Sequence, residues 1–233
     1  MNASDDQRQL TAILFTDMKG YTETMERDEQ LARRLVRRQR EVQNTHVETH
    51  GGEVLREFGD GFLITFESVI DAVRCALAIQ GELQDEHEPA LRMGVHIGDV
   101  VLEEGSLQGS GVIVAQRIET ITPPRGVCVS DTVWDQVHNQ PDLEAVSLGF
   151  HALKGISRQV EVFQVFVAGS EAVQAATEAV PAAAAPQALS EQPLLAEAAQ
   201  RPENRLTRYG VTGLIAASIL LTAGLPGHRT DGR

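Results

Sequence analysis

The chain has 233 residues, of which 42% are hydrophobic, and a formal net charge of -13. This length allows one globular domain of ordinary size with a tail, and the hydrophobic content is sufficient for a core. The acidic balance argues against a nucleic-acid partner, because such proteins bind through clustered Lys and Arg. Cys75 and Cys128 lie in apolar stretches, so we expect buried free thiols in a reducing compartment.

The first half of the chain predicts a strand, a long helix, a hairpin and a second helix. Residues 1–10 are polar and acidic, unlike a secretory signal, so we expect an N-terminal tail and a cytoplasmic domain after it. Glycines at 51 and 52 predict the end of the first helix, and a turn at 59–61 predicts the hairpin. The expected elements are a strand over 11–16, a helix over 22–50, strands over 53–58 and 62–66, and a helix over 71–83.

The second half continues the alternation of strands and helices. The expected elements are a hairpin of 91–97 and 100–102 around Gly98 and Asp99, a helix over 109–121, a strand over 126–129, a short helix over 131–138, and a closing strand over 160–167. The order β, α, β, β, α, β with later additions predicts an α+β fold of the ferredoxin-like (split βαβ) type. This plan is an antiparallel sheet with helices on one face, and it spans residues 11–167.

Two aspartates end or follow predicted strands. Asp17 follows the first apolar run, and Asp60 lies between Gly59 and Gly61 in the hairpin turn. Magnesium is held by one or two carboxylates and keeps open positions for substrate phosphates. A pair of aspartates on neighbouring strands therefore suits two metal ions that bridge a triphosphate. Alone, either aspartate could equally be a turn or cap residue.

Five blocks of the sequence together resemble a class III nucleotide cyclase catalytic domain. The blocks are FTDMKGYT, FGDGFLITFES with the helical DAVRCALAIQ, LRMGVHIGDVV, GSGVIVAQRIE and ALKGISRQVEVFQV. They occur in the family's order and at its usual spacing, and they cover residues 9–167. One block would be weak evidence, whereas five in register are specific.

The resemblance implies a metal site and a phosphate site. Asp17 and Asp60 match the aspartates that hold two Mg²⁺ or Mn²⁺ ions per site. The ribose 3′ oxygen of ATP then attacks the α-phosphorus in line and expels pyrophosphate, which yields 3′,5′-cyclic AMP. The loop between the first strand and the helix would turn its backbone N–H groups toward phosphate oxygens. Its residues are Met18, Lys19, Gly20, Tyr21 and Thr22.

Two basic residues match further family positions. Arg117 matches the arginine that stabilises charge on the α-phosphate in the transition state, a role that suits a planar, permanently charged guanidinium. Lys154 matches a lysine that holds the terminal phosphates. Outside these blocks, they would be a solvated helix arginine and a surface lysine.

Three positions depart from the family pattern for adenylate cyclases. Arg56 stands where a base-selecting lysine is usual, and Ser106 stands where an aspartate or threonine is usual. Ile113 replaces the asparagine that orients the ribose. An isoleucine side chain cannot donate or accept a hydrogen bond, and losing one such contact costs about 1 to 3 kcal/mol.

The resemblance implies an adenylate cyclase that acts as a homodimer. In the family each site lies between two protomers, with the metals on one and the arginine, lysine and base-binding residues on the other. This chain carries candidates for both halves, so two-fold symmetry would create two sites. The alternatives are a degenerate module that binds nucleotide or dimerises without turnover, and a cyclase for GTP or a pyrimidine triphosphate.

The last third of the chain has a different composition. Residues 168–200 are rich in Ala, Pro, Glu, Gln and Ser and predict a disordered linker. Residues 201–208 are basic, 209–227 form an uncharged apolar run, and 228–233 form a tail. The run is near the lower limit of about 17 residues for a bilayer span. We expect a single C-terminal helix that anchors the cytoplasmic domain to the cytoplasmic membrane; the alternative is a docking helix.

Overall fold

The computed structural model describes residues 8–85, 89–103 and 106–179. At 102–103, 106–107 and 178–179 it describes the backbone alone. These residues all belong to the first of two compact units, Met1–Ala188. Residues 1–7 of the predicted tail 1–10, residues 180–200 of the predicted linker 168–200, and the predicted segments 201–208, 209–227 and 228–233 lie outside the described residues. Residues 8–10 of the predicted tail instead begin the first strand. Across the described ranges, no helix is both long and apolar enough to cross a bilayer.

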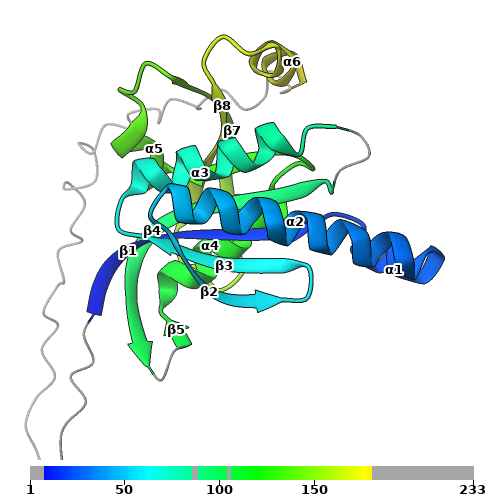
Figure 1. The fold of residues 1–233 in the computed structure, drawn as a ribbon. Helices are drawn as coiled ribbons and strands as arrows, with labels where there is room; N and C mark the ends of the chain where they lie inside the picture. Colours follow the sequence, from blue (N-terminus) through cyan, green and yellow to red (C-terminus); the bar gives the residue numbers. More distant parts are fainter. Residues whose placement is uncertain (1–7, 86–88, 104–105, 180–233) are drawn as a thin grey trace, which may run out of the picture. The chain divides into compact units, whose positions relative to one another are not determined.

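The described unit is built on one mixed sheet with the strand order β2-β3-β1-β4-β6-β8-β7, and β5 pairs with β4 beside this path (Figure 1). All pairs are antiparallel except β4 with β6, which is parallel. The strands are β1 Arg8–Met18, β2 Glu53–Phe58, β3 Gly61–Phe66, β4 Leu91–Glu103, β5 Ser106–Gln108, β6 Val127–Ser130, β7 Leu143–Ala152 and β8 Gln159–Val167.

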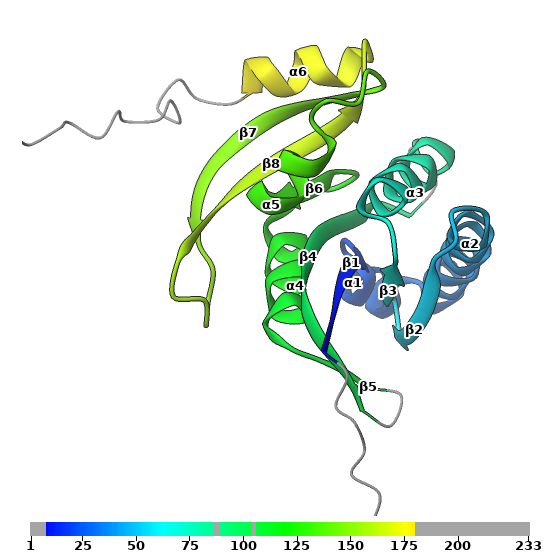
Figure 2. The same cartoon turned by 90° about the vertical axis from the view of Figure 1, so that its left-hand side faces the viewer.

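Helices cover both faces of the sheet. The helices are α1 Tyr21–Arg27, α2 Glu29–Thr49, α3 Val69–Glu82, α4 Ser110–Ile121, α5 Asp131–Val137 and α6 Glu171–Ala179. Alternate residues of β1 point to opposite faces: Leu14 joins the core under α2 and α3, whereas Phe15 joins Ala115 of α4. Figure 2 shows α4 on the opposite side of β1 and β4 from α2 and α3. The α+β class is confirmed, but the prediction that helices lie on one face is wrong for α4.

The predicted hairpin at 91–102 is instead one continuous strand, β4. It pairs with β1 along the whole of β1, from Arg8 opposite Val101 to Met18 opposite Leu91. Gly98 suggested a turn, yet it serves close packing: an added Cβ would lie 2.8 Å from the Cα of Gly111 in α4. The glycine therefore admits the helix backbone and does not reverse the chain.

Other boundaries changed for local reasons. The helix predicted over 22–50 is divided at Asp28, whose side chain accepts a hydrogen bond from the Leu31 N–H at 2.9 Å and caps α2. The sequence analysis missed β7, whose burial pattern lacks clear alternation. It also placed residues 171–179 in the linker, where the structure has α6.

The predicted buried thiols are confirmed. Cys75 and Cys128 are both free and buried, and burial raises the pKa of each thiol to about 12. Both side chains pack in the core as small apolar groups.

Candidate active site

Asp17 and Asp60 lie at neighbouring strand ends. Asp17 is the penultimate residue of β1, and Asp60 lies in the turn between β2 and β3. The register pairs the end of β1 with the start of β3, which brings the two aspartates to the same edge. Gly59 has a φ of 70°, a left-handed conformation that suits glycine. At Gly61 an added Cβ would lie 2.9 Å from the carbonyl oxygen of Thr16, so glycine also permits the close approach of β1.

The two carboxylates repel each other in a partly buried position. Burial raises the pKa of Asp60, and the negative charge of Asp17 raises it further. Backbone hydrogen bonds at Asp60 and Met18 and the charge of Arg92 act in the opposite direction, to a smaller extent. A divalent cation between two such carboxylates would relieve the repulsion.

The donor set fits Mg²⁺ or Mn²⁺. Carboxylate oxygens are hard ligands, which these cations prefer. Within the described ranges, no group of three or more His, Cys, Asp or Glu side chains is placed to hold a metal ion. A cation at Asp17 and Asp60 would therefore take its remaining ligands from water, backbone or substrate oxygens.

Arg92 and Glu119 also belong to this site, and the sequence analysis did not identify them. Arg92 lies opposite Asp17 in the register of β1 and β4, and its guanidinium forms an ion pair with the Asp17 carboxylate. The same Nη2 lies 3.0 Å from Oε1 of Glu119 on α4. The available signal for Arg92 was its position as the one Lys, Arg, Asp or Glu in the apolar stretch 91–97, because a charge that is partly buried needs a partner. Identifying Glu119 as part of the site required knowing that α4 packs on the sheet beside Arg92.

Glu119 is almost fully buried, and its pKa is raised to about 7. Burial is the largest cause, and Arg92 opposes it, while Asp17 and Asp60 add negative charge nearby. Arg92 is shared with Asp17, so its attraction does not offset the loss of hydration at Glu119. The site thus holds three carboxyl groups and one guanidinium.

The loop of residues 18–22 connects β1 to α1 as predicted, although its residues play different parts. The Met18 side chain is buried in the core, and the Lys19 N–H donates to the Ala90 carbonyl at 2.9 Å. These two residues can therefore offer little to a phosphate beyond the exposed Lys19 side chain. Gly20 has a φ of 79° and is the N-cap of α1. Tyr21 and Thr22 therefore lie in the first turn of α1, where backbone N–H groups lack helical partners.

Arg117 and Ile113 lie one turn apart on α4, away from the buried side of the helix. Arg117 is half-buried, and its Nε atom is buried without a hydrogen-bond partner among the described residues. Arg117 is therefore less exposed to solvent than an arginine that projects fully from a helix. Ile113 is 44% exposed, so this β-branched side chain does not belong to the domain's own core.

Lys154 is exposed in the turn between β7 and β8. Leu153 beside it packs in a cluster with Val114 and Ile118 of α4, so the structure brings the Lys154 turn against the helix of Arg117. Within the described residues, neither Arg117 nor Lys154 forms an ion pair with Asp17 or Asp60.

The residues predicted to read the base lie apart from one another in sequence and structure. Arg56 is exposed on β2, and its guanidinium carbon lies 5.6 Å from the centroid of the Phe58 ring. Phe58 in turn stacks on Phe15 at 6.4 Å between ring centroids. Ser106 begins β5 opposite Glu103 of β4.

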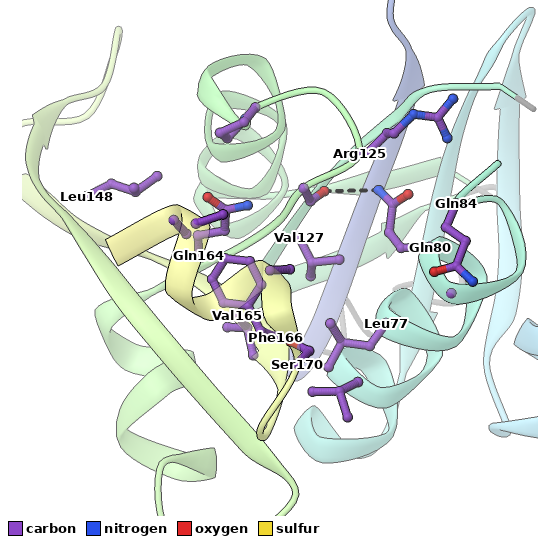
Figure 3. Close-up of a pocket in the computed structure, with 17 residues that line it drawn as sticks. Leu77, Gln80, Gln84, Arg125, Val127, Leu148, Gln164, Val165, Phe166 and Ser170 are labelled. Carbon is purple, nitrogen blue, oxygen red and sulfur yellow. Dashed lines mark hydrogen bonds between the residues drawn. The ribbon is translucent and has the colours of Figure 1, made fainter. Parts of the chain in front are cut away.

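A large cavity lies elsewhere in the described residues. It has a volume of about 960 Å³ and is bounded by α3, the strands β6 to β8 and α6 (Figure 3). Leu77, Val127 and Phe166 give it an apolar lining, and Gln80 at its side donates to the Gly126 carbonyl at 3.1 Å. Neither aspartate lines it, so cavity size does not locate the site of chemistry here.

Known proteins are similar to this chain in sequence and fold. No family model matches the chain. The adenylate/guanylate cyclase/hydrolase of Silicibacter pomeroyi, a solved structure, is 36% identical and has a TM-score of 0.64; the match covers 69% of this chain and 98% of that one. "Putative adenylate cyclase 3" of Rhizobium meliloti (strain 1021) is 39% identical over 165 residues, which cover 67% of this chain.

The fold is that of a nucleotidyl cyclase catalytic domain. The chain belongs to the class III adenylate/guanylate cyclase family, whose members generally use divalent metals, bind nucleotides and act as dimers. It spans only 28% of the length of the Rhizobium protein. It spans 39% of Streptomyces coelicolor adenylate cyclase, which is 27% identical over 150 residues.

Proposed function

We propose that this chain is a nucleoside triphosphate cyclase, with ATP as substrate, that acts as a homodimer with two divalent metal ions per site. The observation that carries the proposal is the meeting of Asp17 and Asp60 at one edge of the sheet, where burial and then the negative charge of Asp17 raise the pKa of Asp60. The names of the relatives, which include adenylate cyclases, support the choice of ATP.

The chain's own residues would position the triphosphate and stabilise charge. Asp17 and Asp60 would hold Mg²⁺ or Mn²⁺, which when bound lowers the pKa of the attacking ribose 3′ hydroxyl and neutralises the phosphates. The first turn of α1 offers N–H groups to phosphate oxygens. Arg92 pairs with Asp17 in the structure, so cation binding at Asp17 must weaken or replace that ion pair.

Arg117 would stabilise the charge that develops on the α-phosphate, and Lys154 would hold the terminal phosphates. The buried and unpartnered Nε of Arg117 supports this role, because an anion would complete its hydrogen bonding. The shared packing of α4 with the turn of Lys154 supports a common surface for both cations.

The proposed homodimer would share each site between its two protomers. One protomer would supply the aspartates, and its partner would supply Arg117, Lys154 and the base-binding residues. The exposed Phe58 and Ile113 favour burial against a second copy or a substrate, because large apolar side chains are stabilised by leaving water.

The base preference depends on Arg56, Ser106 and Ile113. Incubation of the purified chain with each of the four nucleoside triphosphates and Mn²⁺, followed by analysis for cyclic product, tests the proposal. Cyclic AMP as the main product is expected. Cyclic GMP or a cyclic pyrimidine nucleotide would reassign the base, and no cyclic product from any of the four would contradict turnover.

The second candidate is a module that binds nucleotide without turnover. Ile113 favours it, because the exposed apolar side chain cannot orient a ribose by hydrogen bonding. Nucleotide binding without any cyclic product in the same incubations would select this candidate.

The C-terminal membrane anchor stays a prediction from the sequence. If residues 209–227 span the membrane, deletion of 201–233 releases the protein into the soluble fraction without loss of cyclase activity, because the linker separates the run from the domain. Cell fractionation with activity measurement checks this. Full-length chain that is already in the soluble fraction would mean that the run docks to protein.

A further inference from the structure

Two glutamines on α2 are completely enclosed beneath the metal site. Gln39 and Gln43 both have 0% exposure, although α2 is otherwise rich in charged residues. Residues four apart lie on the same face of a helix, so the two amides are neighbours. Amides buried in an apolar core are costly unless they form hydrogen bonds, so their partners matter.

Each glutamine holds one of the two strand ends that carry an aspartate. The Gln39 Nε2 donates to the backbone carbonyl oxygen of Asp60 at 2.6 Å. On the other side, the Thr16 hydroxyl donates to Gln43 Oε1 at 2.9 Å, and Thr16 directly precedes Asp17. Both contacts are long-range in sequence, so α2 ties the turn between β2 and β3 to the end of β1.

The remaining amide atoms are complementary. Within the described residues, Gln39 Oε1 and Gln43 Nε2 are buried without a hydrogen-bond partner. One is an acceptor and the other a donor, and side chains four residues apart on a helix are neighbours that can form a hydrogen bond. The chain of contacts would then run without interruption from Thr16 through both glutamines to Asp60.

We propose that Gln39 and Gln43 form a bridge that sets the spacing of Asp17 and Asp60, and thereby the affinity of the site for divalent cations. This inference deepens the proposed function and rests on it. The turn that carries Asp60 contains Gly59 and Gly61, so it has little rigidity of its own and depends on an external hold. Both glutamines are positioning residues, because neither reaches the reacting atoms.

The bridge can be removed with little change in volume. Gln39→Met and Gln43→Met keep a long unbranched side chain and delete the amide hydrogen bonds. Val42→Ala is the matched control, because Val42 lies on the same helix at 1% exposure and packs in the core without holding either strand end. It perturbs α2 and leaves the bridge intact.

The first measurement is the affinity of the full chain for Mn²⁺. The concentration of free Mn²⁺ is followed by electron paramagnetic resonance in the presence of 2′,3′-dideoxy-ATP, which lacks the 3′ hydroxyl and cannot cyclise. Loss of a group that orients metal ligands weakens metal binding about 10- to 100-fold, and we expect this effect for Gln39→Met and for Gln43→Met. For Val42→Ala we expect the Mn²⁺ affinity to change by less than about twofold. The double variant should be no weaker than the singles, since the two amides act as one unit. Equal weakening in Val42→Ala would overturn the bridge.

The second measurement needs neither nucleotide nor metal. Backbone amide hydrogen exchange at residues 59–61 should be at least tenfold faster in Gln39→Met than in Val42→Ala, compared at equal global stability. Unchanged exchange would overturn the proposal even if the cation affinity falls. A wild-type chain that binds no Mn²⁺ would contradict the proposed function, and the exchange rates would still decide whether the bridge holds the turn.

Discussion

At the scale of single residues, the site has more acidic than basic side chains. Arg92 is the counter-ion of both Asp17 and Glu119, and Asp60 has no closer positive partner than Arg92 among the described residues. The carboxylates therefore carry an unbalanced negative charge in the metal-free state. Divalent cations bound at this site would supply positive charge, so that Arg92 would no longer be the only counter-ion of Asp17 among the described residues.

Replacing Asp60 separates its role in chemistry from its role in stability. Asp60→Asn removes a negatively charged metal ligand of the proposed site. Each bound cation contributes several kcal/mol of transition-state stabilisation, so the rate of cyclic nucleotide formation should fall by more than about 100-fold. The same change removes a half-buried charge beside Asp17, so thermal unfolding without metal should occur at a higher temperature. Retained activity would contradict the role of Asp60 as a ligand.

Glu119 predicts a pH dependence of stability. Its pKa is raised from 4.5 to about 7, so between these values the native state binds more protons than the unfolded state. Stability due to Glu119 is complete below pH 4.5 and is lost as the pH rises through 7. The free energy of unfolding should decline across this window by at most about 3 kcal/mol relative to Glu119→Gln.

Urea unfolding of both proteins from pH 4.5 to 7.5 in metal-free buffer measures this difference. A constant difference between wild type and Glu119→Gln over the window would show that the carboxyl does not titrate there.

At the scale of elements, the sequence was informative where a strand or helix carries its own pattern. The apolar run before Asp17 and the glycines around Asp60 predicted the strand ends at which the structure places these two candidate metal ligands. Sequence patterns could not show that α4 crosses to the second face, because its apolar residues would suit either side. For the same reason Glu119 and the pairing of Arg92 with Asp17 required the register of β1 with β4.

Gly98 illustrates how one residue can be misread without its neighbours. Gly98→Ala should lower the free energy of unfolding by about 1 to 3 kcal/mol, because its Cβ would meet the backbone of Gly111 at 2.8 Å and push α4 from the sheet. Gly81→Ala is the control: nothing lies within 4 Å of its Cβ in α3, and alanine should stabilise the helix by up to about 1 kcal/mol. Equal effects in chemical denaturation would contradict close packing at Gly98.

At the scale of the whole molecule, the proposed site draws on two sets of side chains that form no ion pair with each other among the described residues. Asp17 and Asp60 occupy one edge of the sheet, while Arg117 and Lys154 are carried by α4 and the turn that packs on it. If the site is shared between protomers as proposed, a monomer lacks a complete set of groups around one triphosphate. Two copies related by a two-fold axis would place each set opposite the other.

Mixing two inactive variants tests this shared site most directly. Asp17→Ala and Arg117→Ala should each be inactive alone, and after subunit exchange an equal mixture should recover roughly a quarter of wild-type cyclase activity, because half the dimers are mixed and each has one intact site. Exchange is verified by mass spectrometry of differently tagged chains. A mixture that stays inactive although mixed dimers are present, or full activity of Arg117→Ala alone, would contradict a site built from two protomers.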